Sequence, residues 1–183
     1  MVLGIIIAIV VIIAIYVIST FNNLKVLEKR VENSWSQIEV QLQRRFDLIP
    51  NLVETVKGYM KHESETFEKI AALRTSWANT NSVSEKLEID NQLSGALKTI
   101  MAVSENYPEL KANQNFIQLS EELSNTENKL SFSRQFYNDT ATKYNTKLEL
   151  FPSNIIANSF GFKSKVLFAV DNDDARKNVN VQF

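Results

Sequence analysis

One apolar stripe with helical spacing runs through the first third of the chain. Its members recur about every 3.6 residues, which is the period of an α-helix and not of a strand. The pattern predicts a long amphipathic helix that includes residues 30–63 and buries one face against the rest of the protein. The stripe consists of Leu24, Leu27, Val31, Trp35, Ile38, Leu42, Phe46, Ile49, Val53, Val56 and Met60.

A proline lies within this stripe. Pro50 removes one backbone hydrogen bond and crowds the preceding turn, at a cost of about 3 kcal/mol in a helix interior. The stripe nevertheless keeps its phase through Ile49 and Val53, so we expect a kink, or a restart at Pro50, rather than a loop. Beyond the proline the apolar arc widens, which predicts contact with two neighbouring elements. The added positions are Leu48, Leu52 and Tyr59.

Two more long helices are expected downstream. The apolar repeat of the first helix fades towards Trp77, and residues that favour turns fill positions 79–84, where we expect the first true loop. Ser84 is the expected cap of the next helix, which should stop near Asn106 because the residue before Pro108 is pushed out of helical geometry. A third long helix should begin near Asn113.

The end of the chain has a different character. Pro152 should end the third long helix, and a short helix over residues 155–159 should close at Gly161 in the left-handed conformation. With only 4 glycines and 3 prolines, the chain favours an all-α antiparallel bundle with a kinked first helix, behind one N-terminal transmembrane helix. We expect a membrane anchor at residues 1–20, a helical bundle at 21–162 and an extended tail at 163–183.

The first 18 residues carry no charge and would span roughly 27 Å as a helix, close to the thickness of a bilayer core. A cleaved signal peptide is the alternative, but no basic region precedes the apolar run and no small-residue cleavage site follows it. Lys25, Lys29 and Arg30 follow the span, which predicts a single-pass protein of the cell (inner) membrane with its N-terminus outside and its bulk in the cytoplasm.

Composition excludes several classes of function. The 20 basic and 21 acidic residues provide no basic excess for nucleic acid, so we expect no nucleic-acid partner. The chain has no cysteine and one histidine, which removes thiolate metal sites, cysteine nucleophiles and multi-histidine sites. We expect no catalytic residues, no metal and no cofactor.

The remaining candidate chemistry is weak. His62 and Glu63 begin a zinc-protease motif, but the second histidine would stand at Thr66. Adjacent carboxylates such as Glu121 and Glu122 would diverge on a helix, so we interpret them as solvated charge. Asp173 and Asp174 are interpreted in the same way.

The polar face of the first helix is the candidate partner-binding site. Arg45 flanks the apolar stripe, where it would either pair with a carboxylate on another helix or bind a phosphate or lipid headgroup; we favour the pair. The other candidates lie away from the stripe. The complete set is Asn33, Arg44, Arg45, Asp47, Asn51 and His62.

Three segments point to a family. Residues 30–63, RVENSWSQIEVQLQRRFDLIPNLVETVKGYMKHE, resemble the signature segment of the LemA family of bacterial membrane proteins, and residues 137–162 are similar to its second block. The ending with Ala175, Arg176, Val179, Val181 and Phe183 is similar to the family's closing segment, although Asn178 stands where we expect proline. The resemblance implies an antiparallel helical bundle behind one transmembrane helix, and it implies no catalytic residues.

Together these features predict a membrane-anchored, non-enzymatic helical scaffold. It would contact lipid through residues 1–20 and present its bundle to protein partners whose identity the sequence does not give. Self-association stays open, because the wide arc after Pro50 could face a second copy. The alternatives are a membrane-remodelling or lipid-binding protein that uses Lys25, Lys29 and Arg30, and a membrane enzyme without a recognisable motif.

Overall fold

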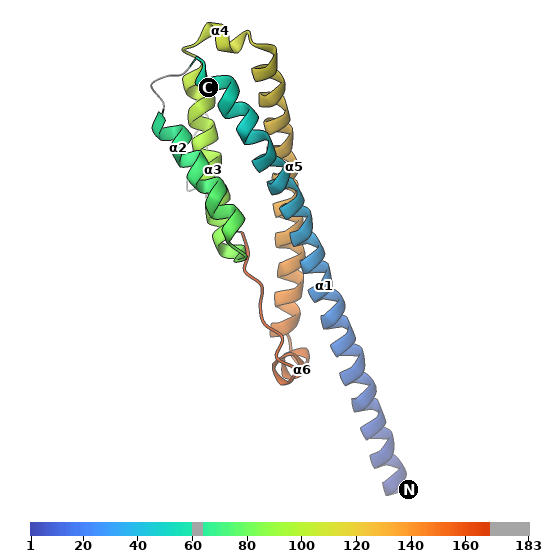
Figure 1. Cartoon of the computed structure of the whole chain (residues 1–183). Coiled ribbons are helices and arrows are strands. Elements are labelled where there is room, and N and C mark those ends of the chain that lie inside the picture. The colour runs from blue at the N-terminus through green and yellow to red at the C-terminus, as the bar shows by residue number, and fades with distance from the viewer. Residues whose placement is uncertain (60–63, 169–183) are drawn as a thin grey trace, which may run out of the picture.

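The computed structural model describes residues 1–59 and 64–168, and within these ranges it contains six helices and no strand. They are α1 (Val2–Lys57), α2 (Ser64–Asn79), α3 (Val83–Ser104), α4 (Pro108–Lys111), α5 (Gln114–Glu149) and α6 (Ser153–Ser159). The second half of α1 packs antiparallel to α5, and α2 pairs with α3 beside them (Figure 1). The predicted all-α antiparallel bundle behind a long apolar N-terminal helix is therefore confirmed.

α1 is one uninterrupted helix that leaves the bundle on its N-terminal side (Figure 1). Pro50 lies inside it, and the helix continues to Lys57 without a restart. The predicted stripe is the buried face: Leu24, Ile38 and Leu42 are fully buried, and Leu27, Trp35 and Val53 are partly buried against the core. The widened arc is confirmed as well, since Leu52 is fully buried and Leu48 and Tyr59 pack against the core. Met60 lies outside the described residues.

The expectation that the first loop lies at residues 79–84 was wrong. α1 already ends at Lys57, and Tyr59 donates its N–H to the carbonyl of Val56 at 3.0 Å in the turn that follows. Gly58 lies at the C-cap, and glycine is a weak helix former, about 1 kcal/mol less favourable than alanine in a helix interior. The apolar positions from Phe67 to Trp77 are thus the inner face of a separate helix, α2, which pairs with α3.

The caps of the later helices differ in part from expectation. Ser82, not Ser84, caps α3: its hydroxyl accepts the N–H of Glu85 at 3.4 Å, because the helix begins two residues earlier than expected. Asn113 caps α5, as its side-chain oxygen accepts the N–H groups of Asn115 and Phe116. The short α4 was not anticipated.

The α2–α3 pair is attached to α1 through aromatic and charged contacts. The Phe46 ring on α1 stacks on the Trp77 ring on α2, with centroids 4.8 Å apart. The ammonium group of Lys86 on α3 lies over the Trp77 ring, 5.0 Å from the ring centroid. The same group pairs with Glu39 on α1 at 2.6 Å. These contacts set the position of α2 relative to the C-terminal half of α1, where a groove opens between the two helices.

Candidate functional site

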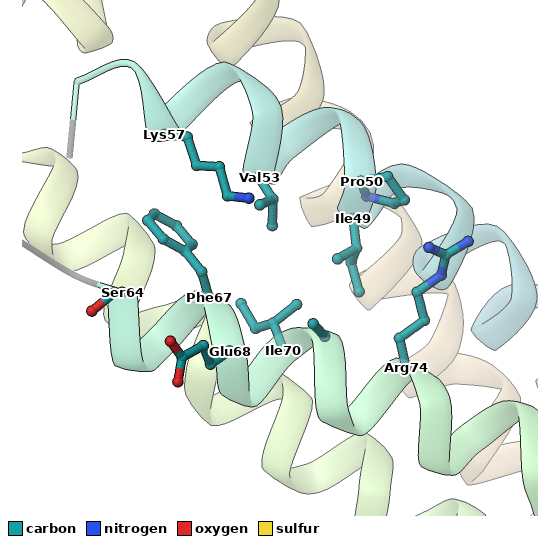
Figure 2. Close-up of a pocket in the computed structure, with 10 residues that line it drawn as sticks. Ile49, Pro50, Val53, Lys57, Ser64, Phe67, Glu68, Ile70 and Arg74 are labelled. Atoms are coloured by element: carbon teal, nitrogen blue, oxygen red, sulfur yellow. The ribbon is translucent and has the colours of Figure 1, made fainter. Parts of the chain in front are cut away.

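A groove of about 610 Å³ lies between the C-terminal part of α1 and α2, around Pro50 (Figure 2). Its apolar surface comes from both helices, and Ala71 contributes only one side-chain carbon to the α2 wall. Lys57 and Arg74 lie at opposite ends of the opening, and Glu68 lies on the α2 side (Figure 2). The other lining residues are Ile49, Pro50, Val53, Ser64, Phe67 and Ile70.

This groove has the chemistry of a peptide-binding surface. Among the described residues, two cations and one carboxylate flank an apolar floor, so the described part of the rim carries a net positive charge. An apolar or amphipathic segment with acidic flanks would be chemically complementary to such a surface, in the way that helices bind in hydrophobic grooves. Sequence analysis pointed to the widened arc after Pro50, but it did not predict a groove, because the position of α2 was not foreseen.

Four of the predicted partner-binding residues lie on the exposed surface of α1: Asn33, Arg44, Asp47 and Asn51. Arg44 pairs with Glu122 on α5 at 2.8 Å, and both side chains are well exposed. Asp47 accepts a hydrogen bond from Gln43 at 2.9 Å. His62 lies outside the described residues, and so do Asp173 and Asp174.

Arg45 has a different environment from these four. It is 3% exposed, and its guanidinium lies 2.8 Å from Asp90 on α3 and 2.9 Å from Glu127 on α5. It also donates to the hydroxyl of Ser94 at 3.0 Å. The favoured interpretation, a pair with a carboxylate of another helix, agrees with this geometry. The guanidinium is therefore directed into the bundle and not towards the outer face of α1.

A second arginine completes the buried charge network. Arg134 on α5 pairs with the other carboxylate oxygen of Asp90, so two cations and two carboxylates connect α1, α3 and α5. Burial lowers the pKa of Arg45, and the charge of Glu127 opposes that change. Burial and the neighbouring Arg45 lower the pKa of Arg134. The network balances its own charge, which suits a role in helix register better than acid–base chemistry.

Sequence analysis missed Asp90 and Arg134, although both interrupt apolar stripes. Asp90 stands three residues before the buried Leu93, and Arg134 stands between the buried Leu130 and Tyr137. A charged residue at such a position requires a partner inside the bundle. That spacing is the signal that would have found them.

α5 also holds the chain that follows α6. Asn138 and Asn145 are seven residues apart and lie on one face of α5. Asn145 donates to the carbonyl of Lys165 at 2.8 Å and accepts the N–H of the same residue at 2.9 Å. Asn138 makes the equivalent pair with Phe168, at 3.1 and 2.8 Å. The first part of the predicted extended tail, residues 163–168, is thus fixed along the bundle.

Among the described residues, no group of three or more histidine, aspartate or glutamate side chains could hold a metal ion. In the same part of the chain, α1 is the one helix long and apolar enough to cross a membrane, and the apolar stretch that qualifies it is not buried in the protein.

Comparison with known proteins supports this picture. The sequence model of the LemA family matches residues 34–183. Protein LemA of Metamycoplasma hominis is 30% identical over 152 residues, which cover 80% of this chain and 68% of that protein. Magnetosome proteins MamQ 1 and MamQ 2 of Paramagnetospirillum magneticum are each 24% identical, over 81% of this chain and 64% of those proteins, which is less than two thirds of their length.

None of these relatives is named for a reaction, and the long apolar helix is consistent with a membrane-associated protein. The family model covers most of the chain, including the groove-forming helices, the buried charge network and the asparagines of α5. The chain therefore belongs to the LemA family.

Proposed function

We propose that this protein is a membrane-anchored helical scaffold without catalytic activity, which binds protein partners at the groove between α1 and α2. The observation that carries the proposal is the continuity of α1. One helix contains both the apolar N-terminal segment and the groove residues Ile49, Pro50 and Val53. The groove would stand about 45 Å along the helix from the anchor, at 1.5 Å per residue.

The anchor comprises residues 1–20. Ile5, Ile12 and Ile15 are 61%, 66% and 62% exposed, and no other described part of the chain covers them. Each large apolar side chain left in water forgoes about 1.5–3 kcal/mol of burial free energy, so a bilayer is the natural environment for this segment.

The proposed orientation places the N-terminus outside the cell membrane and the bundle in the cytoplasm, because basic residues follow the span. The chain has no cysteine, so single cysteines can report topology. In intact cells, a membrane-impermeant maleimide should label a Val2→Cys variant and should leave a Thr75→Cys variant unlabelled until the membrane is permeabilised. Labelling of Thr75→Cys in intact cells would reject a cytoplasmic bundle.

Headgroup binding by the basic residues after the anchor is the less favoured function. Lys25 pairs with Glu28 at 2.9 Å, and Lys29 pairs with Glu32 at 2.6 Å. These carboxylates offset the positive charge that an anionic lipid surface would attract. Tubulation of anionic liposomes by the full-length protein would favour membrane remodelling instead.

An enzymatic function is tested by thermal unfolding. Ligands that bind the folded state raise its melting temperature by mass action. A scaffold should show no reproducible shift with divalent metals or nucleotides. A shift of several degrees with any one of them would contradict the non-catalytic assignment.

A further inference from the structure

The end of the bundle from which the N-terminal part of α1 extends carries an exposed apolar surface, which is separate from the proposed partner groove. It is formed by the connection from α5 to α6 and by α6 itself (Figure 1). Leu150, Phe151, Ile155 and Phe160 are 52%, 78%, 57% and 57% exposed. These four large apolar side chains lie within residues 150–160 and form an exposed apolar patch of the kind that marks a binding surface.

This surface lies beside the point where α1 enters the bundle. The Phe160 ring is 4.9 Å from the Phe21 ring, and the Phe162 ring is 5.7 Å from it, between ring centroids. Phe21 directly follows the proposed anchor, residues 1–20, and Lys25 is the first charged residue in the sequence. α6 is therefore at the height where the proposed anchor leaves the hydrocarbon region.

The outward position of these side chains is built into the local structure. α6 buries Ser153, Ile156 and Ala157 on its inner side. The Ser153 hydroxyl binds the carbonyls of Lys147 and Leu150, at 2.7 and 2.8 Å, and this contact fixes the turn that contains Phe151. Because the inner face is already packed, Phe151 and Ile155 cannot join the core without unfolding α6.

We infer that the α5–α6 turn and α6 form a second membrane contact, in which Phe151 and Ile155 insert into the boundary between lipid headgroups and acyl chains. The inference rests on the proposed transmembrane anchor, which holds this surface at the bilayer. Amphipathic elements bind membranes in this way, with the apolar face buried at the boundary and the polar groups left in water. The contact would restrict the tilt of the bundle on its single anchor.

Depth-dependent quenching of single-cysteine variants tests the inference. Full-length Phe151→Cys, Phe132→Cys and Val10→Cys proteins are each labelled with an environment-sensitive fluorophore and reconstituted into phosphatidylcholine and phosphatidylglycerol vesicles that contain nitroxide-labelled lipid. Phe132 is the matched control, because it is 73% exposed against 78% for Phe151. It lies on α5, roughly 25 Å from the C-terminal end of that helix and therefore further from the membrane than Phe151.

The expected result is strong quenching at positions 10 and 151, with quenching at position 132 several-fold weaker. Quenching at position 10 without greater quenching at 151 than at 132 would overturn the interfacial contact and leave the anchor intact. Absence of quenching at position 10 would overturn the anchor, and the interfacial contact with it. Circular dichroism of the labelled proteins confirms that each variant retains its helices.

Discussion

The guanidinium of Arg45 on α1 lies 2.8 Å from the carboxylate of Asp90 on α3, and both side chains are almost completely buried. The two residues are 45 positions apart in the sequence, and Glu127 and Arg134 on α5 extend the contact to a third helix. The network thus connects α1, α3 and α5, which suits a role in the register of these three helices.

Truncation of Arg45 should be far more costly than truncation of the arginine beside it. Arg45→Ala leaves Asp90 buried with one cation fewer and should lower the free energy of unfolding by about 3–5 kcal/mol. Arg44→Ala removes only the exposed pair with Glu122 and should cost less than about 1 kcal/mol. Denaturant unfolding in detergent measures both, and similar losses in the two variants would contradict a register role for the network.

Asn138 and Asn145 of α5 should protect the backbone amides of the segment after α6 from hydrogen exchange. Asn145→Ala removes two hydrogen bonds to Lys165. It should lower stability by about 1–3 kcal/mol and speed amide exchange in residues 163–168. Asn128→Ala, an exposed position on the same helix, is the control and should leave exchange there unchanged. Unchanged exchange in Asn145→Ala would mean that other contacts hold the segment.

Tyr144 should make the fold sensitive to alkaline pH. Burial, with the charges of Glu28 and Glu32, raises the pKa of Tyr144 from 10.0 to about 12. Because the folded-state pKa is the higher one, its stabilising contribution is fully present below pH 10 and is lost as the pH rises towards 12. The wild type should therefore lose stability over this range more steeply than Tyr144→Phe, as measured by unfolding at a series of pH values.

The same variant has an expected result at neutral pH. The Tyr144 hydroxyl is buried and has no hydrogen-bond partner among the described residues. Its removal should therefore leave stability unchanged or raise it by up to about 1 kcal/mol. A large loss of stability in Tyr144→Phe would show that the hydroxyl has a partner, and parallel pH profiles would reject the raised pKa.

Charge reversal on the outer face of α1 tests the partner surface predicted from the sequence. Arg44 and Asp47 are exposed, and each has one exposed partner within the chain. The double variant Arg44→Glu and Asp47→Lys should change the free energy of unfolding by less than about 1 kcal/mol and should reduce recovery of partners from native membranes. Full recovery with intact folding would remove this face from the partner-binding site.

Sequence periodicity was sufficient to predict which face of α1 is buried, because that pattern depends on one helix alone. The same kind of pattern predicted α5, and the helix-ending signal of glycine predicted the left-handed Gly161 after α6, where φ is 72°. Periodicity did not predict the end of α1 at Gly58. Apolar residues recur at helical spacing in both α1 and α2, so the pattern did not reveal that these are two separate helices.

The candidate site was less accessible from the sequence. The groove depends on where α2 lies against Pro50, and the partners of Arg45 depend on which turns of three helices meet. Periodicity gives the inward face of a helix but not its register against another helix. Asn138 and Asn145 were missed for the same reason, since their partners are backbone groups of a segment without periodic structure.

Two adjacent alanines of α2 test most directly whether the groove between α1 and α2 binds a protein partner at the membrane. Ala71 lines the groove, whereas Ala72 is also exposed on α2 and is not among the lining residues. Ala71→Arg should fill the groove and remove specific proteins from the set recovered with the full-length protein from native membranes, and Ala72→Arg should retain them. If Ala71→Arg recovers the same proteins in the same amounts as Ala72→Arg and the wild type, the groove is not the binding site.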